Sequence, residues 1–351
     1  MFYEIYADGV SIMDNAVEGK TIRDPELSRA VSTTAILKLG MPRKNVYYNY
    51  IKPYVTTLEV REDSHTIFVG RALPPSLDMD GTRRYRVEGA YAWLNDVIID
   101  PAAIPQPEEA KDTSTYITNI IDYYNSRVGA SRQLDVTVLP AAGTNLSVRE
   151  WKAESCADAI GRELDDVGLV ALVRHVTQTG RTGLRVVDYR EYISNQQPLG
   201  QVLEWGKNIT KIEIEGLTYV TALHAKGDGI ELWVEEPDMI AASGYICGEA
   251  EWKDITDPAD LRARALTYLR DEQPYKTSHV EVSAVDLHLT DPSADRLELA
   301  RPVQIDAAMH GVPGGTILPI SAIKYRLDRP QKDIVAAWPE QVIPTLTGRM
   351  R

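Results

Sequence analysis

The side chains with acid–base chemistry are dispersed along this chain of 351 residues. Glu150 and Glu154 are four positions apart, a spacing that places two carboxylates on one face of a helix. The run Ser147-Val-Arg-Glu150 is a capping box, however, and capping accounts for Glu150 without any catalytic role. Asp286 lies within the strand phrase Ala-Val-Asp-Leu, where we expect it to be buried and paired rather than to transfer protons.

Motifs for metal binding and nucleophilic catalysis are absent from the sequence. The six histidines form no His-Glu-x-x-His pair, and no Gly-x-Ser-x-Gly elbow occurs. His279 and His288 are expected on opposite faces of one strand, and Cys156 and Cys247 lie far apart, with Cys156 expected as a buried free thiol. No helix pattern follows Gly311–Gly315, which indicates a hairpin tip rather than a phosphate site. We therefore expect no catalytic residue, no metal and no cofactor.

Composition excludes some classes of protein. The net charge is −13, so the chain is not expected to bind nucleic-acid phosphates, although DNA could pass acidic walls that repel it. Tyrosine is abundant (18) and phenylalanine scarce (2), which favours a β-rich protein with much contact surface. Neither a signal peptide nor a membrane segment is expected, so we expect the chain to fold in the cytoplasm.

Short strands dominate residues 1–104. Thr57–Arg61 and Ile67–Leu73 are expected to pair through the turn Glu62–His65, and Tyr85–Gly89 adds a third strand with Tyr85 and Val87 on one face. Several short strands with turns between them predict a β-barrel. The proline-rich run 101–107 then ends this domain.

Helical spacing appears in residues 105–198, which predict an α+β domain with two helices and a hairpin. One helix carries Ile117, Ile120, Ile121 and Tyr124 and stops before Gly129, and the second is expected to begin at the Ser147 capping box. Leu169–Val176 and Leu184–Tyr189 flank a glycine-containing turn.

A second β-barrel is predicted from residues 199–227 together with 277–340, with strands in Gly206–Gly216, Ser278–Leu289 and Thr316–Pro330. An acidic α+β domain is inserted at 228–276. Its helix starts at Asp257-Pro258 and turns Leu261, Ala265 and Leu269 inward. Residues 225–275 hold 12 Asp and Glu against 5 Lys and Arg, which fits a solvated lobe or a charge-matched interface. The last residues, 341–351, form a tail.

Four strand phrases in this order resemble one family. They are Thr66–Leu73 followed by Tyr85–Asp96, Gly206-Lys-Asn followed by Val-Thr-Ala-Leu, Ala-Val-Asp-Leu, and Tyr325–Pro330. Together they resemble the hub region of phage tail-tip or baseplate hub proteins, the family of tail-associated lysins and prophage tail endopeptidases. The resemblance covers residues 1 to about 340. Since about 20 residues follow Pro330, the C-terminal enzyme domain of that family is expected to be missing.

The resemblance implies a structural protein of the virion tail tip, assembled in the host cytoplasm. It implies a β-rich α+β chain with two similar barrels, three copies of which form a ring below the six-fold tail tube. Subunit contacts in such a ring are heterologous. Implied partners are the tail tube or a distal tail protein ring and a spike or fibre protein, with a tape measure protein as a further candidate. Genomic DNA would pass through the channel without specific binding.

Interface candidates are chosen among Tyr, Trp, Phe and Arg, since large aromatic residues and Arg most often anchor interfaces. Each could equally belong to the core of its own barrel, an interpretation favoured for two of them, Phe68 and Trp93. The candidates are Phe68, Arg71, Tyr91 and Trp93 in the first barrel and Trp205, Tyr219, Tyr325 and Arg326 in the second.

Two alternatives remain open. Aromatic and acidic residues could line a sugar groove, making the chain a cell-envelope glycan-binding or hydrolysing tail protein with a carboxylate pair. Alternatively, Ile343–Arg351 could dock a separate spike or fibre protein.

Overall fold

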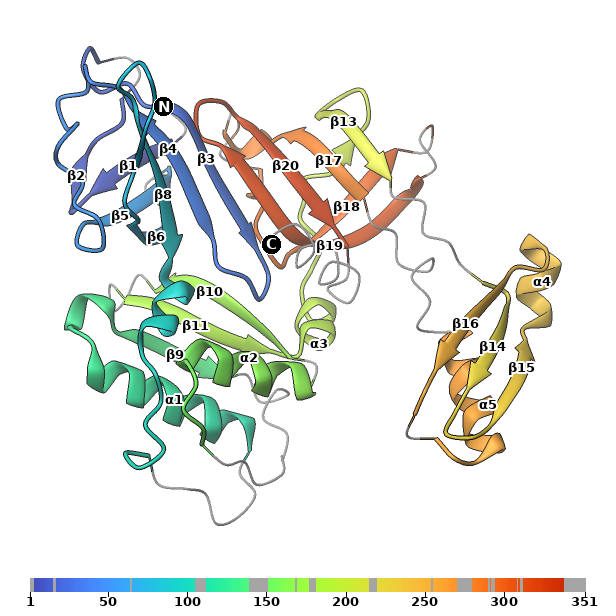
Figure 1. Cartoon of the computed structure of the whole chain (residues 1–351). Coiled ribbons are helices and arrows are strands. Elements are labelled where there is room, and N and C mark those ends of the chain that lie inside the picture. The colour runs from blue at the N-terminus through green and yellow to red at the C-terminus, as the bar shows by residue number, and fades with distance from the viewer. Residues whose placement is uncertain are drawn as a thin grey trace.

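The computed structural model describes residues 3–14, 17–63, 65–104, 112–138, 151–167, 169–176, 181–214, 220–253, 255–269, 280–289, 291, 294–307, 309 and 312–337. Within these ranges the chain is a β-rich α+β protein, as expected. A large, mostly antiparallel sheet curls across the top of the molecule, and two small mixed sheets lie apart from it (Figure 1).

Fourteen strands of the described residues form the large sheet, in the order β13-β17-β20-β19-β3-β4-β8-β6-β5-β1-β2 with β7, β12 and β18 paired alongside. These strands fall into two units, the first within residues 3–89 and the second within residues 203–336. The strands of the first unit are β1 (Tyr3–Ala7), β2 (Val10–Ser11), β3 (Arg23–Ala30), β4 (Ile36–Met41), β5 (Thr57–Glu62), β6 (His65–Ala72), β7 (Ser76–Leu77) and β8 (Arg83–Gly89). Those of the second unit are β12 (Leu203–Glu204), β13 (Ile209–Ile214), β17 (Val280–Val285), β18 (Pro302–Ala307), β19 (Val312–Arg326) and β20 (Gln331–Ala336).

Alternation places one face of each strand in the core. Leu58 and Val60 of β5 are buried, and Tyr85 and Val87 of β8 share the buried face as predicted. The β5–β6 hairpin is also confirmed, although Glu62 belongs to the strand rather than to the turn.

The two predicted barrels are not separate, because the sheet runs on from one unit to the other. β3 pairs with β19 in antiparallel register, with Leu27 opposite Tyr325 and Ala30 opposite Ala322. Buried side chains of both units form one hydrophobic core. The alternation in each segment shows which face is buried, but it carries no information about which strand pairs across the boundary.

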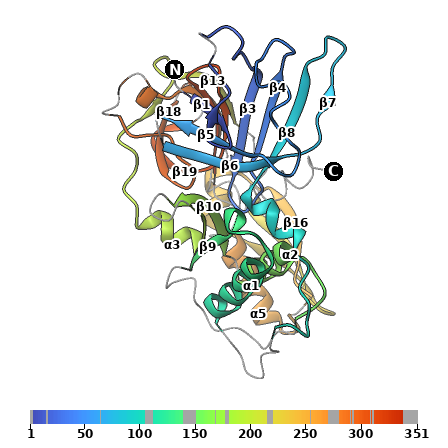
Figure 2. The same ribbon diagram turned by 90° about the vertical axis from the view of Figure 1, so that its left-hand side faces the viewer.

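The α+β domain (residues 112–194) packs below the first unit (Figure 2). Its elements are α1 (Thr113–Arg127), β9 (Leu134–Val138), α2 (Cys156–Val167), β10 (Val170–Val176), β11 (Arg181–Val187) and α3 (Tyr189–Ser194), with sheet order β10-β11-β9. Helix α1 begins where the Asp112 carboxylate accepts a hydrogen bond from the Thr115 N–H (2.7 Å). The predicted apolar face of α1 is buried, and the predicted hairpin is β10–β11.

The second helix starts later than predicted. Trp151 to Glu154 are not helical, and α2 begins at Cys156. The Ser155 hydroxyl accepts from the Asp158 N–H (3.0 Å) and donates to the Asp158 carboxylate (2.7 Å). This serine therefore caps the helix. Ser147 and Glu150 of the predicted capping box lie outside the described residues. Trp151 is buried instead against Tyr116, at 5.7 Å between ring centroids.

The inserted domain (residues 220–269) consists of β14 (Ala222–Lys226), β15 (Glu231–Glu235), α4 (Pro237–Ser243), β16 (Cys247–Glu251) and α5 (Pro258–Thr267). Asp257 caps α5, and Leu261, Ala265 and Leu269 are buried, as predicted. β14 falls in the range expected for the second barrel, but it is the central strand of the sheet β15-β14-β16. Its Leu223 and Ala225 are buried in the core that α5 closes, which is why it belongs to this domain.

The strand predicted at Ser278–Leu289 ends at Val285. Asp286 turns its carboxylate inward, where it accepts a hydrogen bond from the His288 N–H (3.1 Å) and so favours a 3₁₀ turn at Leu287–Leu289. His288 is therefore not in a strand, and His279 lies outside the described residues.

Candidate assembly interfaces

A buried ionic cluster joins the two units of the large sheet. The Lys332 ammonium lies 2.6 Å from the Asp286 carboxylate and 2.8 Å from the Glu62 carboxylate. Asp286 and Lys332 come from the second unit and Glu62 from the first. All three side chains are buried. Gln201 also donates to Asp286 (2.9 Å), so the carboxylate is held from several sides.

Mutual attraction outweighs burial in this cluster. Burial by itself lowers the pKa of Lys332, but the carboxylates of Glu62 and Asp286 hold that pKa above its ordinary value. For Asp286, burial alone raises the pKa. Lys332 and Gln201 lower it by more than burial raises it, so the pKa of Asp286 lies below its usual range. Both groups are therefore charged near neutral pH.

This cluster has the residue types of an acid–base site but no access for a substrate. Its ammonium and carboxylates are enclosed by the shared core, and a second pair, Tyr3 and Tyr325, packs edge to face beside it at 6.2 Å between ring centroids. The prediction that Asp286 is buried and paired is confirmed. Sequence reasoning missed Lys332, although alternation with the buried Ile334 and Ala336 places it on the core face.

Other candidates for chemistry have structural partners. The Glu154 carboxylate binds Arg162 at 2.6 Å rather than a second carboxylate. Cys156 is a free thiol in the core, and burial raises its pKa to about 12. His224 lies 3.1 Å from Glu231 and stacks on Trp233. In the part of the chain that the structure describes, no three His, Cys, Asp or Glu side chains gather to hold a metal ion.

Three of the predicted interface residues lie inside the chain. Phe68 and Tyr325 belong to the shared core of the large sheet, and Trp93 belongs to the core of the α+β domain. Their large side chains have the packing that the alternative core interpretation described, and they leave almost no surface for another chain.

The remaining candidates are placed differently. Arg71 is buried at the base of the first unit, where it pairs with Asp96 and lies 3.8 Å from Glu88. Tyr91 packs partly buried against the α+β core. Arg326 is half-exposed and pairs with Glu26 and Asp333 (3.2 and 3.3 Å) along the sheet. Trp205 is exposed after β12. Tyr219 lies outside the described residues.

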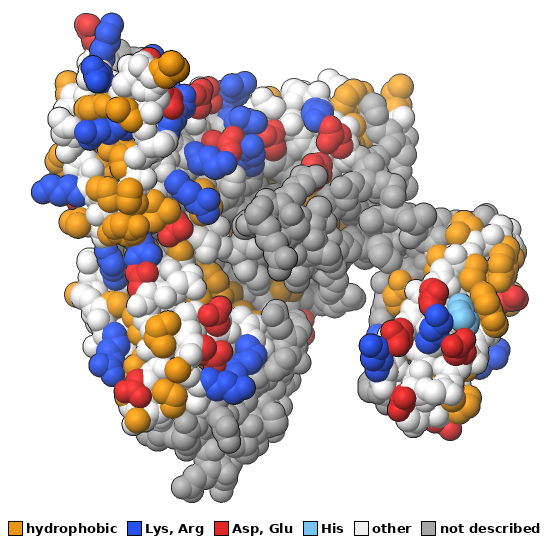
Figure 3. All heavy atoms as spheres, in the orientation of Figure 1, with side chains coloured by type: hydrophobic (Ala, Val, Ile, Leu, Met, Phe, Trp, Pro, Cys, Tyr) orange, Lys and Arg blue, Asp and Glu red, His pale blue; other side chains and the backbone are white. Residues whose placement is uncertain are grey.

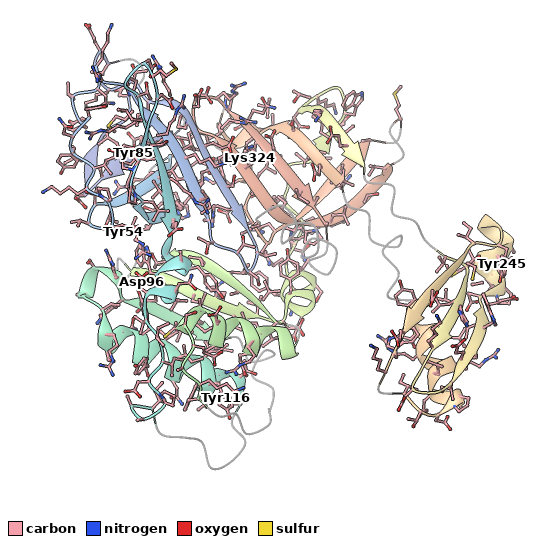
Figure 4. All side chains as sticks on the ribbon, viewed as in Figure 1. Tyr54, Tyr85, Asp96, Tyr116, Tyr245 and Lys324 are labelled. Carbon is pink, nitrogen blue, oxygen red and sulfur yellow. The ribbon has the colours of Figure 1, made fainter. Side chains whose placement is uncertain are left out.

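The loop 42–56 between β4 and β5 is an exposed apolar surface that sequence reasoning missed. Val46 and Val55 are 69% and 70% exposed, and Tyr50 and Tyr54 are also exposed. Figure 3 shows hydrophobic side chains gathered on this side of the first unit, at the left of the view. Figure 4 places Tyr54 near Asp96, at the boundary with the α+β domain. The four tyrosines and three basic residues without any acidic residue in 42–56 were the available signal.

A groove of about 400 Å³ crosses the face of the sheet opposite the core. It spans β13, β17, β20, β19, β3 and β4, so its floor is continuous across the junction of the two units. Charged side chains of both signs line it, among them Lys211, Glu281 and Asp333. Among the described helices, none has the length and apolar character needed to span a membrane.

No protein-family description matches the sequence, and no curated protein sequence matches it. Solved structures do match. The 43 kDa tail protein of prophage MuSo2 from Shewanella oneidensis is similar at a TM-score of 0.65 and 15% identity, with 96% of this chain and 97% of that chain covered. Prophage tail protein gp18 from Listeria monocytogenes is similar at a TM-score of 0.56 and 10% identity, covering 99% and 98%.

A third match is the E. coli c3393 protein, a component of the type VI secretion system described as similar in structure to the T4 bacteriophage tail proteins gp27 and gp5. Its TM-score is 0.52 at 11% identity, with 89% of this chain and 72% of that chain covered. The chain therefore has the fold of phage tail proteins over nearly its whole length. The resemblance to phage tail proteins drawn from the four strand phrases is confirmed at the level of the fold.

Proposed function

We propose that this chain is a baseplate hub protein at the tip of a phage or phage-like tail. Three copies form a ring that closes the six-fold tail tube and supports a spike or fibre protein. The structural similarity to prophage tail proteins over nearly the full length supports a place in a phage tail. The strand order of the large sheet supports the ring.

The observation that carries the proposal is a repeat in topology. Six strands of the first unit lie in the order β3-β4-β8-β6-β5-β1, and six of the second lie in the order β13-β17-β20-β19-β18-β12. In both units these strands also follow one another along the chain in the same succession. One difference is that β1 pairs antiparallel with β5, whereas β12 pairs parallel with β18. The chain thus contains two similar barrel-like units.

The two units meet head to tail. β19 of the second unit pairs with β3 of the first, and β3 occupies the position that β13 holds in the second unit. A contact between unlike faces of like units can repeat, and it closes into a ring when the rotation permits. Three chains with two units each supply six similar modules, which is the symmetry a six-fold tube requires.

The proposed partners follow from this position. The tail tube or a distal tail protein ring lies above, a spike or fibre protein lies below, and a tape measure protein is a further candidate inside the channel. The net charge of −13 suits a channel that lets DNA pass without binding it. We propose no enzymatic activity, since the buried ionic groups have structural partners and no route to a substrate.

Electron-microscopic class averages of the purified protein, with mass measured by light scattering at several concentrations, test this proposal. A three-fold ring with a central channel and three times the chain mass of 39.1 kDa is the expected result. Compact monomers at all concentrations, including when mixed with tail-tube protein, would contradict it.

One observation favours a second candidate, binding of cell-envelope glycans. The inserted domain leaves one face of its small sheet uncovered, and Trp233 on that face is 59% exposed with its ring stacked on His224. Glu231 and Glu249 lie on the same sheet. Exposed aromatic rings beside carboxylates can bind sugar rings. Pull-down with purified peptidoglycan, comparing wild type with Trp233→Ala, tests this role, and equal retention of both proteins would reject it.

A further inference from the structure

The exposed loop 42–56 has a counterpart in the second unit. It connects β4 to β5, and residues 286–301 connect β17 to β18 at the same point of the repeat. Both connections are of similar length, and both leave the same end of a similar unit. What the counterpart contacts therefore indicates what the loop is built to contact.

The counterpart crosses the boundary between units. His288 lies 3.5 Å from the Asp63 carboxylate, and Arg296 lies 3.7 Å from the Glu62 carboxylate. Glu62 and Asp63 stand at the end of β5 in the first unit. The described part of the β17–β18 connection thus packs on the turn end of the β5–β6 hairpin of the first unit.

The hydrogen bonds of loop 42–56 lead back to its own unit and the α+β domain. Tyr48 donates to the Gly81 carbonyl (2.8 Å), Val46 donates to the Gly19 carbonyl (2.8 Å), and Arg132 donates to the Tyr54 carbonyl. The outward side chains of Val46 and Val55 are left exposed. If the contact between the two units repeats around a ring, the unit next to this loop is the second unit of another copy.

We infer that loop 42–56 of one copy packs on the β18–β19 edge of a second copy, an edge that we define by Asp306, Met309 and Ile317. This inference rests on the proposed ring and names the surfaces that join its chains. The β18–β19 hairpin occupies in the second unit the place of β5–β6 in the first. The second copy therefore offers the loop the end of its β18–β19 hairpin, which is equivalent to the β5–β6 end that Arg296 and His288 contact within one chain.

The two surfaces are complementary. Met309 is 89% exposed and Ile317 is 49% exposed, so the edge carries apolar surface to cover Val46 and Val55. Asp306 stands opposite Glu204 in the β12–β18 pairing and adds negative charge. The loop carries Arg43, Lys44 and Lys52 and no acidic residue. Apolar contact surrounded by opposite charges favours a specific interface.

A mixed cross-linking experiment tests the inference. One full-length protein carries Val46→Cys and the other Ile317→Cys, both in a Cys247→Ser background because Cys247 is exposed and Cys156 is buried. Oxidation of the mixture should yield disulfide-linked pairs, whereas either protein alone should yield none above background. Ile98→Cys mixed with Ile317→Cys is the control, since Ile98 is exposed on another part of the chain.

Substitution supplies an independent measurement. Val46→Asp with Val55→Asp should raise the concentration at which the oligomer dissociates about a hundredfold, because each buried valine contributes roughly a factor of ten. Ile98→Asp should leave it unchanged. A three-fold ring that forms without the mixed cross-link and resists the double substitution overturns this inference but keeps the ring. Monomers without any cross-link overturn both.

Discussion

Replacing Lys332 by Met should destabilise the junction between the two units by about 4 kcal/mol near pH 7. Breaking a buried ion pair by removing one partner costs about 3–5 kcal/mol, because the remaining charge stays in a low-dielectric interior. Here the change leaves two buried carboxylates, Glu62 and Asp286, without their cation. Gln201 and the His288 N–H still donate to Asp286, which keeps the loss within that range.

Hydrogen exchange read by mass spectrometry is the suitable assay, since a chain with several domains has no single unfolding free energy. Peptides that cover β5 and β20 should lose about a thousandfold in protection, because each factor of ten corresponds to about 1.4 kcal/mol. Lys324→Met is the matched control. Lys324 is partly exposed and pairs with Glu26 at 3.0 Å, so its loss should cost less than about 1 kcal/mol.

The pH dependence follows from the directions of the shifts. The lowered pKa of Asp286 gives stability that is present above the unfolded value, about 3.9, and is lost as the pH falls through the folded value. The raised pKa of Lys332 gives stability that is present below about 10.4 and is lost as the pH rises through its folded value. Without Lys332, burial raises the pKa of Asp286. Protonation of Asp286 as the pH falls then removes a buried unpaired charge and stabilises the variant.

The cost of Lys332→Met should therefore shrink between pH 7 and pH 5. Adding Glu62→Leu and Asp286→Leu to it should recover most of the protection, since apolar residues can replace a buried ionic cluster. Protection that stays within about tenfold of wild type at pH 7, with no dependence on pH, would refute the assignment of Lys332 as the residue that holds the junction.

Three further outcomes are expected. Ser155→Ala should lower the local stability of α2 by about 1 kcal/mol, because the helix loses its N-terminal cap; exchange of α2 peptides measures this, and an unchanged rate would contradict the revised helix start. Asp257→Ala should have a similar effect, about 1 kcal/mol, confined to α5 of the inserted domain. A thiol reagent at pH 8 should label Cys247 in the native protein and leave Cys156 unlabelled until denaturation, because Cys156 is buried and its pKa is raised to about 12; rapid labelling of both would contradict the buried position.

Several elements could be predicted from local sequence because local physics fixes them. The Asp257-Pro258 start of α5 needs only a capping carboxylate and a proline at the first helical position. The buried face of α1 follows from helical spacing, and that of β8 from alternation. Burial of Asp286 followed from its apolar neighbours, since a lone carboxylate among strand residues must find a partner.

Other features depend on contacts between residues far apart in the chain. Glu62 and Lys332 meet because β5 and β20 are brought together by the pairing of β3 with β19, and each strand alone reads as an ordinary amphipathic strand. The start of α2, by contrast, is a local feature, because Ser155 and Asp158 are three residues apart and hydrogen-bond each other.

The sequence by itself determined that the chain is β-rich, where many of its strands lie and which of their faces are buried, because these depend on neighbours within a few residues. Only the tertiary structure decided that two similar units share one sheet, that the Lys332 cluster joins them and that loop 42–56 is left uncovered. Strand pairing uses backbone hydrogen bonds that are nearly the same for every residue type. The choice of partner strand is therefore made by the packing of the whole core.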